Sequence, residues 1–69
     1  MSDDAFNMSM RKFLKQVGVT SQTEIEKAIR AAKDAGTLSS ETVTARMVLT
    51  IGEVELEHVV EADIVVGDA

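Results

Sequence analysis

The chain has 69 residues, so it forms at most one small domain, whose stability margin is thin because a small domain buries little of its surface. It contains no cysteine and one histidine, which excludes disulfide bridges and a structural zinc site of the usual kind. Twelve acidic and seven basic side chains give a net charge of −5, which disfavours general nucleic-acid binding, because so acidic a chain gains nothing from counterion release at phosphates.

The hydrophobic fraction of 45% argues against a disordered chain, and no apolar run approaches the roughly eighteen residues that a membrane span needs. The first residues are acidic where a signal peptide would be basic, so we expect a cytoplasmic protein with no membrane partner. Residues 1–36 carry six basic and five acidic groups, a net of +1, whereas residues 37–69 carry one basic and seven acidic groups, a net of −6. The acidity is therefore concentrated in the C-terminal half.

A first helix is predicted over residues 4–17, where apolar residues recur at spacings of three and four and line one face. These residues are Phe6, Met10, Phe13, Leu14 and Val17. Gly18 follows, where a left-handed C-terminal cap favours a glycine. A second helix is predicted over residues 21–35, because Ser21 and Glu24 are spaced as a capping box and Gly36 ends the apolar periodicity.

Strict alternation of apolar and polar residues follows, over residues 43–51 and again over residues 54–65. A period of two is typical of half-buried strands. The sequence therefore predicts a single α+β domain over residues 1–69, in which two N-terminal helices pack on one face of a C-terminal antiparallel β-hairpin. A two-stranded hairpin is marginal by itself, so dimerisation that extends it into a larger sheet is part of this expectation.

The register of the hairpin depends on its loop, and an even loop places the two apolar sets on one face. The shortest even loop is Gly52-Glu53, which suits a type II′ turn. This loop predicts that Leu49 lies beside Leu56. On the outer face it places Arg46, the single basic residue of this half, opposite a valine and diagonal to two glutamates.

Four strings of the sequence carry a resemblance when they are taken together. They are DAFNMS at residues 4–9, RKFLKQVGVTS at 11–21, EIEKA at 24–28 and LEHVVE at 56–61. In combination they resemble a family of short bacterial proteins catalogued as a domain of unknown function. The resemblance covers nearly the whole chain and implies a bacterial, stand-alone protein, but it brings no activity, cofactor or site residue with it.

Two groups of charged residues form a candidate interaction surface. The basic group is Arg11, Lys12 and Lys15, and the acidic group is Glu55, Glu57 and Glu61 together with Asp63. The acidic residues fall on one face of the second strand, with about 7 Å between neighbouring positions on that face. A solvated sheet face is the simpler interpretation. The functional interpretation is contact with a basic partner, either another protein or the basic group of a second copy.

His58 lies in the middle of the second strand among apolar neighbours, and the predicted register places it beside Met47. The nearby glutamates point to the other face of the strand, so a metal site or an acid–base pair is not expected there. No phosphate-binding glycine loop and no nucleophile motif is present in the sequence. We therefore expect no enzyme and no cofactor.

Two functional hypotheses from different classes follow. The preferred one is a small, non-catalytic protein-interaction module that acts as a homodimer or binds a larger partner protein. The alternative is a divergent helix-turn-helix regulator, because residues 13–21 followed by an amphipathic helix resemble the turn of that motif. Glu24 and Glu26 count against the alternative, since they lie where bases and phosphates would be read.

Overall fold

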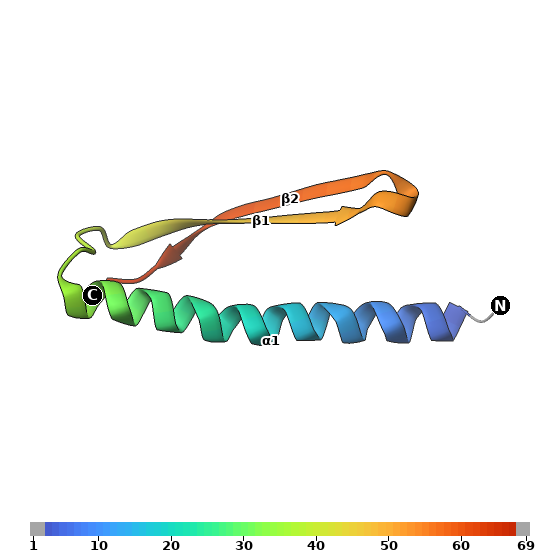
Figure 1. Cartoon of the computed structure of the whole chain (residues 1–69), viewed down its shortest axis with the longest axis horizontal. Coiled ribbons are helices and arrows are strands. Elements are labelled where there is room, and N and C mark those ends of the chain that lie inside the picture. Colours follow the sequence, from blue (N-terminus) through green and yellow to red (C-terminus); the bar gives the residue numbers. More distant parts are fainter. Residues whose placement is uncertain (1–2, 68–69) are drawn as a thin grey trace. The chain divides into compact units, whose positions relative to one another are not determined.

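The computed structural model describes residues 3–67 and shows an α+β chain (Figure 1). A long helix, α1 (Asp3–Ala35), precedes an antiparallel hairpin of β1 (Thr42–Ile51) and β2 (Leu56–Val65), and a 3-10 turn, η1 (Gly52–Val54), lies between the strands. The chain divides after Leu38 into two compact units, one containing α1 and the other containing the hairpin.

The prediction of two helices was wrong, because α1 continues through Gly18 and Ser21 without a break. A glycine inside a helix costs about 1 kcal/mol relative to alanine, which weakens a helix but does not end it. The hydroxyl of Thr20 donates to the Gln16 carbonyl at 2.8 Å, so this side chain is satisfied within the helix. The helix-turn-helix hypothesis depended on a corner at this place, and α1 has none.

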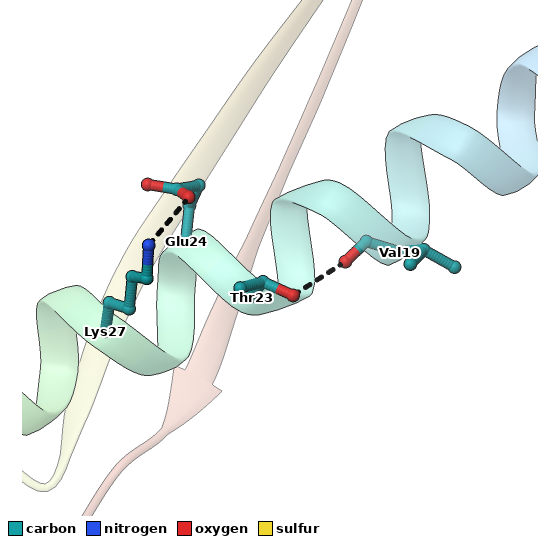
Figure 2. Close-up of polar contacts among 4 residues, drawn as sticks. All are labelled: Val19, Thr23, Glu24 and Lys27. Carbon is teal, nitrogen blue, oxygen red and sulfur yellow. Dashed lines mark hydrogen bonds and ion pairs between the residues drawn. The ribbon is translucent and has the colours of Figure 1, made fainter.

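The predicted capping box is also replaced by contacts within a continuous helix (Figure 2). Glu24 does not cap a helix start but pairs with Lys27 one turn later, with 3.7 Å between Oε2 and Nζ. The hydroxyl of Thr23 donates to the Val19 carbonyl at 3.3 Å. Both side chains therefore use partners one turn away, and no backbone amide at Ser21 needs a cap, because it lies in the helix interior.

The end of α1 at Ala35 confirms the predicted stop at Gly36. Gly36 has a φ of 72°, in the left-handed region, and its N–H donates to the Lys33 carbonyl at 3.1 Å. The N–H of Thr37 donates to the Ala32 carbonyl at 3.0 Å. These two bonds form a Schellman motif, which satisfies carbonyls that the end of a helix leaves unpaired.

Two glycines of α1 and its cap are expected to respond in opposite directions to alanine. Gly18→Ala should stabilise the chain by about 0.5–1 kcal/mol, because the position is helical and an added Cβ would meet nothing within 4 Å. Gly36→Ala should destabilise it by about 1 kcal/mol, because the positive φ disfavours any side chain. Urea unfolding followed by circular dichroism at one fixed chain concentration measures both. Equal effects of the two substitutions would contradict this account of the helix.

The hairpin confirms which residues share a face but corrects their register. Ile51 pairs with Leu56 and Leu49 pairs with His58, so the predicted pair of Leu49 and Leu56 is shifted by two residues. Met47 accordingly pairs with Val60 and not with His58. The connection contains four residues where two were predicted. Because both numbers are even, the apolar residues of the two strands still lie on one face.

The connection between the strands is a 3-10 turn that ends in a strained residue. Glu55 has φ 53° and ψ 36°, in the left-handed region, and its N–H donates to the Gly52 carbonyl at 3.2 Å. The structure thus places the positive φ at Glu55, where the predicted type II′ turn would have required it at Gly52. This conformation destabilises the folded state by roughly 1–2 kcal/mol for a residue that has a Cβ.

Glu55→Gly is therefore expected to stabilise the hairpin by about 0.5–1 kcal/mol, since it removes the steric penalty and keeps the backbone hydrogen bond. Glu53→Gly, two residues earlier within η1, is the matched control. The φ of Glu53 is not positive, so Glu53→Gly relieves no steric penalty and should lower the free energy of unfolding by a few tenths of a kcal/mol. The midpoint of urea unfolding for the two variants distinguishes them, and a loss of stability for Glu55→Gly would argue against strain in this turn.

The base of the hairpin is closed by backbone bonds to a single carbonyl. The N–H groups of Val66 and Gly67 both donate to the Glu41 carbonyl, at 2.7 and 2.9 Å. A Cβ on Gly67 would lie 3.0 Å from the Glu41 Cα, so a larger residue would fit only after a small shift of the backbone, and this close approach favours glycine. Val66 is 8% exposed and is the one buried hydrophobic side chain among residues 3–67.

Candidate interaction surfaces

The basic group lies on the N-terminal half of α1. Arg11 and Lys15 are four residues apart and share one side of the helix, whereas Lys12 is turned from Arg11 by about 100°. An open depression beside Arg11 is lined by Asp4, Asn7 and Met8, all from the same helix. A hollow between side chains of one helix does not enclose a ligand, so the basic group is a surface feature and not a pocket.

The acidic group lies on the hairpin, as predicted, but only partly in one row. Glu57, Glu61 and Asp63 share the polar face of β2, while Glu55 belongs to the turn before the strand. The observed register brings Arg46 directly opposite Glu61, with 3.9 Å between Nε and Oε2. Both side chains are exposed, so this ion pair contributes at most about 1 kcal/mol.

The other polar pairs follow the same register. The Thr44 hydroxyl donates to Asp63 Oδ1 at 3.1 Å, and Thr50 lies opposite Glu57. At the centre of this polar face the two valines Val48 and Val59 lie opposite each other, and both are exposed. The face thus has three polar pairs around a central pair of valines, with Val65 opposite Thr42 at its end. Charged side chains on an exposed sheet face are typical of a solvated surface that discourages pairing with other strands.

His58 is on the apolar face of the hairpin, opposite Leu49 and away from the carboxylates of β2. Within residues 3–67, no group of three histidine, aspartate or glutamate side chains is arranged to hold a metal ion. The sequence placed His58 on the correct face but opposite the wrong neighbour.

The surface that was not predicted is one continuous stripe of mostly apolar side chains along α1. Glu24 interrupts it, because this residue lies on the same side of the helix as Val17 and Ala28. The members of the stripe recur in steps of eleven residues, from Phe6 to Val17 to Ala28 and from Met10 to Ser21 to Ala32. We call this set the α1 stripe; its members are Phe6, Met10, Phe13, Leu14, Val17, Ser21, Ile25, Ala28 and Ala32. Eleven residues make very nearly three turns of 3.6 residues, so the stripe runs almost straight along roughly 40 Å of helix.

The large members of the α1 stripe are exposed. Phe6 is 62% and Phe13 48% exposed, and Met10, Leu14 and Ile25 are exposed as well. Val17, Ser21 and Ala32 are half-buried. The signal for this stripe was present in the sequence, because the spacing of Leu14, Val17 and Ser21 stays in phase across Gly18. The prediction of a break at that glycine concealed it.

A family model described as a family of unknown function (DUF6494) matches residues 1–67. The chain belongs to this family. The match confirms the resemblance to a family without assigned function, and it covers both units of the DUF6494 chain. Neither a curated protein nor a solved structure matches the chain. In the part of the chain that the structure describes, α1 is the one α-helix, and it is too polar to cross a membrane.

Proposed function

We propose that this DUF6494 chain is a non-catalytic protein-interaction module that completes its apolar core with a protein partner. The observation that carries the proposal is the exposure of its apolar side chains. Among residues 3–67 one hydrophobic side chain is buried, whereas fifteen large ones are exposed. Exposed apolar side chains in such numbers, on both α1 and the hairpin, are typical of a surface that another chain covers.

The architecture of each unit supports the same proposal. Over residues 3–67, one unit contains a single α-helix, α1, and the other contains a single two-stranded sheet. A helix or sheet with an apolar face has to bury that face against another layer, and a two-stranded hairpin is marginally stable by itself. The apolar residues of both units therefore need a covering surface, which the proposal assigns to a protein partner.

The proposal assigns no catalytic residue, cofactor or metal, and it places the protein in the cytoplasm, as the sequence predicts. The alternative, a DNA-binding regulator, has less support. The chain's net charge of −5 opposes binding to phosphates. The continuous helix α1 also lacks the corner between two helices that a helix-turn-helix motif requires.

Sedimentation equilibrium and thermal unfolding, each from about 1 to 100 µM, test the proposal, because binding to the folded state raises its stability. We expect an average mass above the 7.4 kDa of one chain and a Tm that rises with concentration. A single species of one chain mass with a cooperative, concentration-independent Tm would contradict the proposal. A gel shift with random-sequence DNA at about 150 mM salt would support the alternative if it showed a complex.

A further inference from the structure

We propose that the open edge of β1 is an interaction surface and that its partner is β1 of a second copy, paired antiparallel about a two-fold axis at Met47. The two hairpins then form one four-stranded sheet. This inference rests on the proposed function, because it names a contact through which a second chain binds the module. The observation that carries it is a row of unpaired backbone groups on a strand with one charged side chain.

The strand register shows which backbone groups of β1 are free. The sheet has two strands, so each strand is paired along one edge and open along the other (Figure 1). The N–H of Val66 donates to the Glu41 carbonyl, and these two residues form the next pair after Thr42 and Val65. Hydrogen-bonded and non-hydrogen-bonded pairs alternate along an antiparallel ladder. The residues whose N–H and C=O groups point to the open edge of β1 are therefore Thr42, Thr44, Arg46, Val48 and Thr50.

The open edges of the two strands differ in charge. By the same alternation, the residues on the open edge of β2 include three acidic ones, Glu57, Glu61 and Asp63. Arg46 is the one charged residue of β1, and the ten residues of this strand include no proline, glycine or lysine. Natural sheets prevent unwanted strand pairing with charged side chains, proline or bulges at their edges. The edge of β2 is protected in this way, whereas the edge of β1 can accept another strand.

The sequence of β1 selects one register for pairing with its own copy. In a two-fold antiparallel pair, residues opposite each other have numbers with a constant sum, and an even sum keeps the apolar residues of both copies on one face. Sums of 92 and 94 pair the longest stretches, residues 42–50 and 43–51. A sum of 92 sets Arg46 opposite its own copy, which is unfavourable. A sum of 94 sets Arg46 opposite Val48 and Met47 opposite its own copy.

The register about Met47 matches residues on both faces of the sheet. On the polar face Thr44 lies opposite Thr50, and paired threonines stabilise neighbouring strands. The two copies of Arg46 are diagonal neighbours at about 7–8 Å, and each has Glu61 of its own hairpin at 3.9 Å on its other side. The pairs on the apolar face are Val43 with Ile51 and Ala45 with Leu49.

Pairing of β1 with β2 of another copy is the competing arrangement. It would use the same backbone groups and would bring Arg46 near acidic residues. Such a contact is heterologous, so it leaves an open β1 edge at one end of the assembly and chains add without limit. The two-fold pairing covers the unprotected β1 edges of both copies and leaves the acidic β2 edges outside. It therefore closes at two chains.

The absence of native cysteine permits a direct test by disulfide cross-linking. Thr44→Cys and Thr50→Cys chains are made separately and oxidised alone or after mixing; both positions are exposed. We expect a covalent heterodimer in the mixture, because the Cα atoms of a hydrogen-bonded pair lie about 5.5 Å apart, a distance that a disulfide spans. Either variant alone should form little covalent dimer, since the two copies of each residue are offset by six residues, about 20 Å.

Thr42→Cys mixed with Thr44→Cys is the matched control. Thr42 is an exposed threonine on the same face of the same strand. In the proposed register it is offset from Thr44 of the other copy by eight residues, about 27 Å, so this mixture should give no heterodimer. Cross-linking equal to that of the Thr44→Cys and Thr50→Cys mixture would show that collisions and not a defined interface produce the disulfide, and it would overturn the proposal.

The remaining outcomes separate this inference from the proposed function. A rapid disulfide in Thr44→Cys alone and in Thr50→Cys alone would mean parallel strands and would overturn the antiparallel arrangement. A sedimentation mass that rises beyond two chains would favour pairing of β1 with β2 and would overturn the closed pair. A dimer that forms no disulfide in the mixture would assign the contact to another surface, such as the α1 stripe, and would overturn the edge pairing but leave the interaction module intact. A monomer at all concentrations would overturn both.

Discussion

Phe13→Ala is expected to weaken self-association of the chain by about 10- to 100-fold in Kd. Full burial of a phenylalanine side chain contributes roughly 1.5–3 kcal/mol. Phe13 is 48% exposed in the single chain, so about half of that free energy is available from burial by a partner, and in a symmetric dimer the loss occurs twice. Alanine is the best helix former, so α1 itself should not be weakened. Sedimentation equilibrium of the variant and the parent chain measures the change.

Met8→Ala is the control for this prediction, because Met8 is on the same helix, is 72% exposed and lies outside the α1 stripe. Its Kd should stay within about threefold of the parent, as expected for a surface substitution worth less than about 0.5 kcal/mol. If Met8→Ala weakened association as much as Phe13→Ala, the stripe would not be the interface.

Val66→Asp is expected to cost more than about 3 kcal/mol, which approaches the whole stability of so small a domain. Val66 is 8% exposed, and its N–H donates to the Glu41 carbonyl at 2.7 Å at the base of the hairpin. A carboxylate at this position must either lose its hydration or force the segment out of its site. Circular dichroism and urea unfolding should show a largely unfolded hairpin.

The neighbouring residue offers a matched control with the same side chain. Val65 is 75% exposed on the polar face of the hairpin, so Val65→Asp should change stability by less than about 1 kcal/mol. The pair compares one substitution at adjacent positions that differ in burial. Similar stability of the two variants would mean that Val66 is not a buried anchor of this segment.

The helical half of the chain was predictable in its residues but not in its continuity. Apolar spacing identified the correct face, and Gly36 was correctly assigned as the end of the helix. Gly18 and Ser21 also carry stop and start signals, but these are weak preferences of about 1 kcal/mol each. A stripe that stays in phase across them, from Val17 to Ser21 to Ile25, favours one helix, and this longer-range pattern prevailed.

The hairpin was predictable in its faces but not in its loop length. Alternation fixes only whether the loop is even or odd, so loops of two and four residues place the same residues on the apolar face. Cross-strand chemistry on the outer face could have decided between them. The observed register pairs Arg46 with Glu61 and Thr44 with Asp63, whereas the shorter loop would have placed Arg46 opposite a valine.

The candidate surfaces were also predictable only in part. The acidic face of β2 and the basic residues of α1 follow from the sequence, because strand alternation and helix spacing determine which side chains share a face. The exposure of Phe6 and Phe13 does not follow, since the same spacing describes a buried core helix. Periodicity identifies an apolar face, and it does not identify what covers that face.

The contacts of both units are local along the chain, and this has a consequence for the rate of assembly. The hydrogen bonds of α1 join residues four apart, and the most distant strand pair, Thr42 with Val65, is bridged by a continuous hairpin. Such elements form within roughly 0.1–10 µs, without a slow search for distant contacts. The encounter of two chains is then the slow step. Refolding from urea should therefore become faster in proportion to chain concentration, although the secondary structure of each chain forms at once.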